Sequence, residues 1–162
     1  MPYGVDIERF RPAPREQDGK FRILFVGQLS QRKGILYLLE AVKRLRLPDV
    51  ELVLVGKRLG FETAFAPYRE FTRLVPHVPY HEVHRLFQQA DLFVYPSLHE
   101  GSAFATYEAL ASGLPIVTTR VGGNTEVVDD DKTGFLVPSQ DPAALADAIR
   151  RMRADPGEAQ AM

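Results

Sequence analysis

The most informative stretch of the sequence contains two glutamates, Glu100 and Glu108, separated by seven residues. Most of the residues between them are small. The segment contains Gly101, Ser102, Ala103, Phe104, Ala105 and Thr106. Small side chains let a ligand reach backbone N–H groups, and the amino terminus of a helix favours anions. The segment therefore predicts a loop that binds phosphate without a basic side chain.

Each glutamate admits two interpretations. A carboxylate accepts two donors at once, so Glu108, in or near the first turn of a predicted helix, can bind both hydroxyls of a ribose. Glu100 can bind hydroxyls of a sugar or stabilise developing positive charge. Alternatively, Glu108 only stabilises its helix through the helix dipole, and Glu100 lies in solvent. The residues alone leave these interpretations open.

A second cluster follows the first predicted strand and reads Gly27-Gln28-Leu29-Ser30-Gln31-Arg32-Lys33-Gly34. The spacing of glycine and lysine differs from that of a Walker A loop. The cluster nevertheless places Arg32 and Lys33 beside the amino terminus of a helix, where a lysine binds phosphate as a point charge. The alternative is a solvated basic turn.

Three other patterns are weaker. Asp129-Asp130-Asp131 resembles an Asp-x-Asp metal motif, but its neighbours predict a turn. His81 and His84 can share a helix face, but a structural zinc needs four ligands and the sequence has no cysteine, so we expect no metal site. Lys57 follows a predicted strand, and we interpret it as a solvated lysine rather than a second phosphate ligand.

Hydrophobic periodicity predicts strands and helices that alternate along the chain. The predicted strands span residues 21–26, 51–55, 72–75, 92–95, 114–118 and 134–137. The predicted helices span residues 34–45, 61–71, 81–90 and 106–112, and a last helix begins at Pro142 with Asp141 as its cap. Such alternation predicts one parallel sheet with helices on both faces. Ligands of such sheets bind beyond the carboxyl ends of the strands, where both clusters lie.

The composition excludes several classes of function. The chain has 162 residues, a formal net charge of −1 and no cysteine. A near-neutral charge predicts no general attraction to nucleic acid or anionic lipid. The sequence also contains neither an apolar run of about 20 residues nor the charged and apolar regions of a secretory signal. We therefore expect one cytoplasmic domain.

The order of these motifs resembles that of the retaining GT-B glycosyltransferases, and in particular the large family sometimes called GT4. The resemblance rests on Glu100 and Glu108 after Pro96-Ser97, and on Tyr3-Gly4-Val5-Asp6, Arg32-Lys33-Gly34, Ala90–Ser97, Glu108–Val117, Gly122-Gly123 and Thr133–Pro138. Each motif alone is weak, but the ordered series along the chain is specific.

The resemblance implies a Rossmann-like α/β domain that forms the C-terminal half of a GT-B enzyme. Residues 1–20 would be an interdomain linker, residues 21–152 the donor-binding domain and residues 153–162 a frayed tail, with the N-terminal acceptor domain absent. The donor would be a nucleotide diphosphate sugar, UDP- or GDP-linked, used without metal or another cofactor and with retention at the anomeric carbon. Any membrane contact would come from the missing half, and the fragment alone would be inactive.

The resemblance also assigns roles to residues. Lys33 and Arg32 would neutralise the diphosphate, Glu100 would hold the donor sugar and Glu108 the ribose. Gly27, Gln28 and the segment 101–106 would lie along the phosphates, with Val75 and His77 near the nucleobase. Two departures stand out. Gln28 replaces a frequent arginine, and Ser102–Ala105 replaces a segment that often reads Gly-Phe-Gly before Leu or Ile and Pro.

Two rival functions share this fold. A dehydrogenase would need Gly-x-Gly-x-x-Gly after the first strand and an acidic residue at the end of the second, and the sequence has neither. A non-catalytic nucleotide-binding or scaffold domain is the other rival. The neutral Gln28 slightly favours it over an enzyme.

Overall fold

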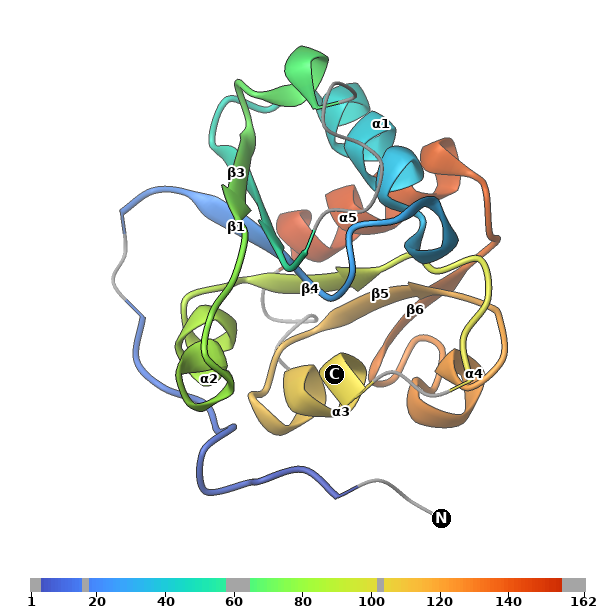
Figure 1. Ribbon diagram of the computed structural model, residues 1–162. Helices are drawn as coiled ribbons and strands as arrows, with labels where there is room; N and C mark the ends of the chain where they lie inside the picture. Colours follow the sequence, from blue (N-terminus) through green and yellow to red (C-terminus); the bar gives the residue numbers. More distant parts are fainter. Residues whose placement is uncertain (1–3, 16–17, 58–64, 102–103, 156–162) are drawn as a thin grey trace.

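The structure is a computed structural model that describes residues 4–15, 18–57, 65–101 and 104–155. Six strands form one sheet in the order β3-β2-β1-β4-β5-β6, and every neighbouring pair is parallel (Figure 1). The strands are β1 (Phe21–Val26), β2 (Val50–Val55), β3 (Thr72–Val75), β4 (Leu92–Tyr95), β5 (Ile116–Thr119) and β6 (Gly134–Val137). The predicted parallel sheet is confirmed.

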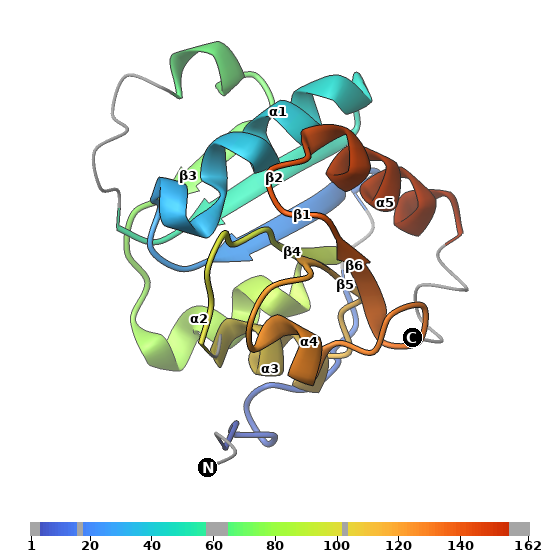
Figure 2. The ribbon, with the colours of Figure 1, turned by 90° about the vertical axis from the view of Figure 1, so that its right-hand side faces the viewer.

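Helices cover both faces of the sheet, as the alternation of elements predicts. The helices are α1 (Ile35–Leu45), α2 (Tyr80–Gln88), α3 (Phe104–Ala111), α4 (Asn124–Val127) and α5 (Pro142–Ala154), with single 3₁₀ turns η1 (Gln31–Lys33) and η2 (Ala66–Tyr68). Helices α1 and α5 pack together on one face, whereas α2, α3 and α4 lie on the other (Figure 2). Within the described ranges, no helix combines the length and apolar character that a bilayer crossing requires.

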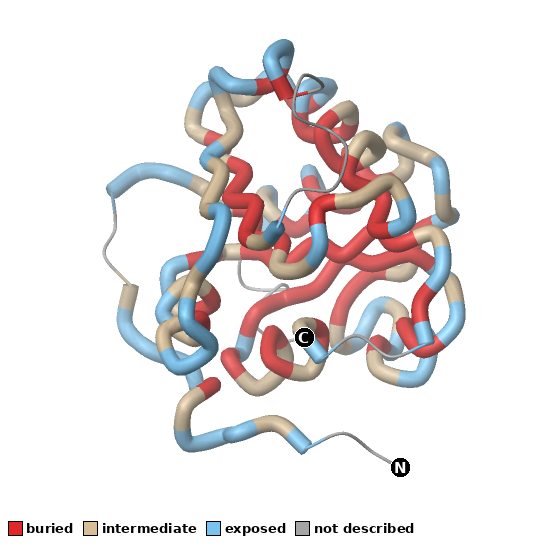
Figure 3. Tube along the Cα trace, viewed as in Figure 1, coloured by how far each residue is buried: buried red, intermediate tan, exposed pale blue. Residues whose placement is uncertain are grey.

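The core consists of the central strands and the inner faces of the helices (Figure 3). All four residues of β4 and all four of β5 are buried, as expected for strands covered on both sides. The predicted inner face of α1 is also buried: Leu38, Leu39, Val42 and Leu45. Full burial of each such side chain contributes about 1.5–3 kcal/mol.

The segment before β1 is a strap that packs under α2. Phe10 is completely buried, and its ring meets the ring of Phe87 edge-on with centroids 5.6 Å apart. The ring of Tyr80, the first residue of α2, lies 6.1 Å from that of Phe10. One aromatic side chain therefore anchors this part of the predicted linker to the domain.

The carboxyl ends of β1 and β4 form the topological switch point of the sheet. From β1 the chain proceeds outward to β2 and β3, and it returns to the other side of β1 at β4. The register pairs Ile23 with Leu92 and Leu24 with Phe93. Loops that leave adjacent strands in opposite directions open a crevice at their carboxyl ends. Both predicted binding clusters follow these two strands.

Most predicted elements agree with the structure to within two residues, but two predictions were wrong and one helix was missed. No helix spans the described part of residues 61–71, where residues 66–68 form a single 3₁₀ turn containing Pro67. Helix α4 was not predicted, because four residues are too few to show a periodic pattern. The predicted frayed tail begins too early, since α5 reaches Ala154 and Arg153 donates to Asp49 at 2.7 Å.

Candidate functional site

The loop after β1 folds back across the sheet edge toward β4. The backbone N–H of Leu29 donates to the carbonyl of Lys57 at 2.9 Å, and η1 follows. The loop ends at Gly34, whose φ of 73° lies in the left-handed region. A β-carbon at Gly34 would clash with the carbonyl oxygen of Pro96. Glycine is therefore needed here both for its conformation and for the close approach of the two loops.

This approach brings Lys33 and Glu100 together. The Lys33 ammonium donates to the Glu100 carboxylate, and the Leu98 N–H donates to the Arg32 carbonyl at 2.9 Å. The side chains of Lys33 and Glu100 are 10% and 7% exposed. Two interpretations are thereby wrong: Glu100 does not lie in solvent, and Lys33 is not part of a solvated turn. The pair lies beyond the carboxyl ends of β1 and β4, where ligands of such sheets bind.

Tyr95, at the end of β4, forms the floor beneath this ion pair. The Lys33 ammonium lies 5.0 Å from the centre of the Tyr95 ring, which stacks on Phe25 with centroids 5.4 Å apart. Burial, followed by the negative charge of Glu100, raises the pKa of the Tyr95 hydroxyl far above its usual range, and the charge of Arg32 partly opposes this. Tyr95 therefore lies beside the Lys33 ammonium, and the Glu100 carboxylate is close enough to influence its hydroxyl.

The loop that carries Glu100 is braced from β5 and α4. The Gly123 N–H donates to the Glu100 carbonyl at 3.0 Å, and a β-carbon at Gly122 would clash with that same oxygen. Deeper in the loop, the Thr119 hydroxyl donates to the Ser97 carbonyl at 2.6 Å, and the Asn124 amide donates to the Ser97 hydroxyl at 3.3 Å. These contacts fix the position of the Glu100 backbone.

Glu108 lies in the second turn of α3 rather than its first, because the helix already includes Phe104. It is 7% exposed. Burial raises the pKa of the Glu108 carboxyl above its usual value, and the nearby hydroxyl of Tyr80 offsets only part of this shift. The structure therefore places Glu108 in a buried position beside the first residue of α2.

The other residues predicted to bind the phosphates differ in exposure. Gln28 and Arg32 are exposed, and Gly27 is half-buried directly above the rings of Phe25 and Tyr95. The amide of Gln28 and the guanidinium of Arg32 can therefore reach a ligand while they stay hydrated. Arg32 lies near enough to Tyr95 to influence its hydroxyl.

The loop before α3 is described only in part. Ser102 and Ala103 lie outside the described residues. Gly101 is exposed, and Phe104 is 52% exposed. Ala105 is half-buried, whereas Thr106 is completely buried. Among the predicted base contacts, Val75 is half-buried at the end of β3 and His77 is exposed on the segment leading to α2.

The predicted turn at residues 129–131 is confirmed. The three aspartates contact Lys132, Arg120 and Arg151 in that order. In the described part of the chain, no group of three or more histidines and carboxylates is arranged to hold a metal ion.

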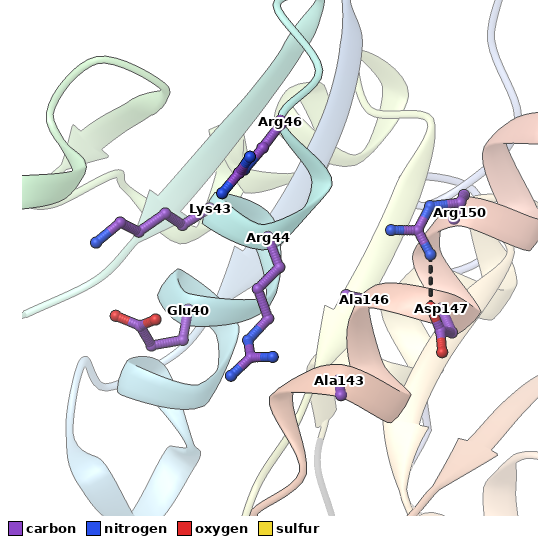
Figure 4. A pocket seen from close by; sticks show the side chains of 8 residues that line it. All are labelled: Glu40, Lys43, Arg44, Arg46, Ala143, Ala146, Asp147 and Arg150. Carbon is purple, nitrogen blue, oxygen red and sulfur yellow. Dashed lines mark hydrogen bonds and ion pairs between the residues drawn. The ribbon is translucent and has the colours of Figure 1, made fainter.

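A groove between α1 and α5 is separate from this site (Figure 4). It is lined by Glu40, Lys43, Arg44, Arg46, Ala143, Ala146, Asp147 and Arg150. Its carboxylates already have partners, because Asp147 pairs with Arg150 and Glu40 accepts from the Tyr68 hydroxyl. The groove includes no residue of the predicted site.

The family model described as glycosyl transferases group 1 matches residues 6–162. The chain belongs to this family. The fold of this group 1 domain is also that of the C-terminal domain of GT-B glycosyltransferases, as predicted.

Relatives of this group 1 domain are much longer. The glycogen synthase of Mycobacterium tuberculosis (strain ATCC 25618 / H37Rv) is 33% identical over 165 residues, covering 97% of this chain and 40% of that protein. Sucrose-phosphate synthase from Thermosynechococcus elongatus has a TM-score of 0.87 at 29% identity, covering 99% of this chain and 44% of that one. Anabaena HepE in complex with UDP has a TM-score of 0.86 at 22% identity, covering 98% of this chain and 48% of that one. The chain thus spans about 40% of the length of the curated relatives it matches.

Sequence reasoning missed three residues of this group 1 site. Tyr95 was predicted as a strand residue, and Tyr80 was missed as a neighbour of Glu108, because ring placement depends on how α2 and β4 pack. Asn124 was missed along with its helix. The Gly122-Gly123 pair was the available signal for the bracing contacts, since adjacent glycines after a strand indicate a close backbone approach.

Proposed function

We propose that the domain binds a nucleotide diphosphate sugar and forms the donor half of a retaining glycosyltransferase that needs no metal. The observation that carries this proposal is the buried Lys33–Glu100 pair at the switch point between β1 and β4. An ammonium and a carboxylate held together there can receive two different parts of one ligand. The ammonium suits a phosphate, and the carboxylate suits sugar hydroxyls.

In this scheme negative charge grows on the departing diphosphate as the bond to the anomeric carbon breaks. Lys33, Arg32 and the backbone N–H groups at the start of α3 stabilise that charge in place of a metal. Glu100 holds the donor sugar and Glu108 the ribose. The acceptor oxygen forms the new bond on the same face, and its proton passes to the departing phosphate, so the domain needs no side-chain base.

The acceptor site belongs to another part of the protein in this proposal. The curated relatives are more than twice as long as the matched segment, which supports a second domain in the complete enzyme. We therefore propose that this chain binds donor and that the longer protein transfers the sugar. The exposed, neutral Gln28 favours the rival proposal of a non-catalytic nucleotide-binding domain.

Calorimetric titration tests the proposal. UDP, UDP-glucose, GDP and GDP-mannose are each titrated into the chain with and without EDTA. We expect one nucleotide series to bind equally well in both conditions. Binding that requires added magnesium would refute metal independence, and no binding of any nucleotide would refute the proposed function. A transfer assay on the longer protein, with retention of anomeric configuration read by NMR, separates an enzyme from a scaffold.

A further inference from the structure

Asn124 is a buried polar residue at the start of α4 to which the proposed mechanism gives no role. It is 1% exposed. Its amide nitrogen donates to the Thr119 carbonyl at 3.2 Å and to the Ser97 hydroxyl at 3.3 Å. Its side-chain oxygen is also buried but accepts no hydrogen bond from the described residues. A buried acceptor without a donor is costly, so the stability of the fold does not favour an amide here over an apolar side chain of the same size.

The amide of Asn124 joins three elements. Asn124 itself begins α4, Thr119 ends β5, and Ser97 lies on the loop that carries Glu100. The Thr119 hydroxyl donates to the Ser97 carbonyl at 2.6 Å. Ser97 and Thr119 are as fully buried as Asn124. The three side chains therefore form one buried polar triad that ties the Glu100 loop to β5 and α4.

The residue before Asn124 extends this connection to Glu100. The Gly123 N–H donates to the Glu100 carbonyl at 3.0 Å. Gly123 and Asn124 are consecutive, so the hydrogen bonds that fix Asn124 also fix the backbone donor that holds Glu100. Lys33 belongs to a different element, since it lies on η1 in the loop after β1. The triad therefore acts on the carboxylate of the site rather than on its ammonium.

We propose that Asn124 is a positioning residue that fixes where Glu100 meets the donor sugar, and that it thereby sets how strongly the site prefers a sugar-loaded nucleotide over the bare nucleotide. The inference rests on the proposed function. It assigns to the same site a further residue and a specificity.

The preference arises because the two parts of the ligand contact different residues. Glu100 holds the sugar, whereas Lys33 and the start of α3 hold the diphosphate. Hydrogen bonds weaken steeply as their geometry departs from the optimum, so a small shift of Glu100 weakens its contacts with the sugar. Bare UDP makes no such contacts. Any change in the Lys33–Glu100 pair affects both ligands alike and cancels in the ratio of their dissociation constants.

The variant Asn124→Leu tests this role, because leucine has a similar size but removes both amide hydrogen bonds. Calorimetry measures the dissociation constants of UDP and UDP-glucose, or of GDP and GDP-mannose if that series binds instead. We expect the sugar nucleotide to weaken by about 3- to 10-fold, as for loss of one hydrogen bond, and the bare nucleotide to weaken less. The preference for the loaded nucleotide should therefore fall.

Thr119→Val and Thr118→Val form a matched pair of variants. The two threonines are consecutive in β5 and buried, and each hydroxyl donates to a carbonyl at 2.6 Å. Thr119 donates to Ser97, whereas Thr118 donates to Tyr95 within β4. Each variant thus loses one hydrogen bond of the same length. Only Thr119→Val loosens the Glu100 loop, so only Thr119→Val should lower the preference.

Thermal melting shows whether each variant is folded, and Thr119→Val decides if Asn124→Leu is not. An unchanged ratio in the deciding variant, or an equal change in Thr118→Val, would overturn the positioning role and leave the proposed function standing. The effect of the deciding variant should also disappear in a Glu100→Ala background, and an effect that persists there would overturn the role, because the triad would then act elsewhere. If the unaltered chain binds no nucleotide and no nucleotide sugar, the proposed function and this inference fail together.

Discussion

Lys33 and Glu100 each depend on the other for a partner in the folded protein. Both side chains are removed from water at the switch point, and they form an ion pair there. Loss of one partner from a buried pair leaves an uncompensated charge, which costs about 3–5 kcal/mol. Replacement of both partners by neutral residues avoids that cost. The intact pair therefore adds little to the net stability of the fold, although the loss of either member alone is costly.

We predict that Lys33→Met lowers the free energy of unfolding by about 3–5 kcal/mol, and that adding Glu100→Gln recovers most of the loss. Chemical denaturation of the single and double variants measures both effects. Arg150→Met is the control, since its pair with Asp147 is largely exposed and contributes less than about 1 kcal/mol. Equal destabilisation by Lys33→Met and Arg150→Met would contradict the buried pair.

Glu108→Gln should weaken UDP more than 2′,3′-dideoxy-UDP. Glutamine keeps the shape of the side chain but replaces one acceptor with a donor. A diol bound by both carboxylate oxygens should then lose roughly 1–3 kcal/mol, and the dideoxy analogue should lose less. Calorimetric titration with both nucleotides measures the difference. If the discrimination is unchanged, Glu108 does not bind the ribose.

The contribution of Glu108 to stability at different pH values separates its two interpretations, which are ribose binding and stabilisation of α3 through the helix dipole. Burial raises the pKa of its carboxyl above 4.5, so the folded protein binds this proton more tightly than the unfolded chain does. The stabilisation from the protonated form is present below pH 4.5 and is lost as the pH rises through the raised pKa. At neutral pH the buried carboxylate is thus no source of stability. Glu108→Gln should leave the melting temperature unchanged or raise it there, whereas a glutamate that only offsets the helix dipole would lower it.

The identities of the charged residues in the site could be predicted from the sequence, but their partners could not. The positions of Glu100 and Lys33 after two strands indicated a shared sheet edge. Their direct contact depends on the exact path of two loops, which no local pattern encodes. Burial of Glu108 was also not predicted, because it depends on where α3 begins and on the packing of α2 beside it.

At the scale of the elements, Gly34 determines how closely the two loops approach. We predict that Gly34→Ala lowers the free energy of unfolding by about 1–3 kcal/mol from its left-handed backbone alone, with a further loss from the clash at Pro96. It should also weaken UDP binding, since Lys33 would be displaced. Gly101→Ala is the control for stability, because a β-carbon there meets nothing within 4 Å. Equal unfolding free energies for the two variants would contradict the close approach.

The elements themselves were well determined by the sequence where they are apolar and regular. Strands β3, β4 and β6 lie where their apolar runs predicted, and the Asp141 carboxylate caps α5 by accepting from the N–H groups of Ala143 and Ala144. Short or proline-containing segments were predicted less well. Residues 61–71 carry a helical pattern, but Pro67 lacks the N–H that a helix interior requires.

At the scale of the whole molecule, the site joins two halves of the sheet that are each continuous in sequence. Lys33 belongs to the half that contains β1 to β3, and Glu100 belongs to the half that contains β4 to β6. A ligand that contacts both residues binds only when the halves are joined. We predict that UDP at 100 times its dissociation constant stabilises the domain by about 2.7 kcal/mol in one cooperative transition. Differential scanning calorimetry measures this, and a second, unshifted transition would contradict it.

The sheet order also has a kinetic consequence. Each strand pair is parallel, so hairpins cannot nucleate folding, and the contact between Lys33 and Glu100 must close a separation of 67 positions. Chains dominated by such non-local contacts fold slowly, because the entropy of closing the loop is lost before any contact compensates for it. We expect local βα contacts within each half to form early and the β1–β4 pairing to form late. The binding site would then be the last part of the molecule to exist during folding and the first to be lost when the halves separate.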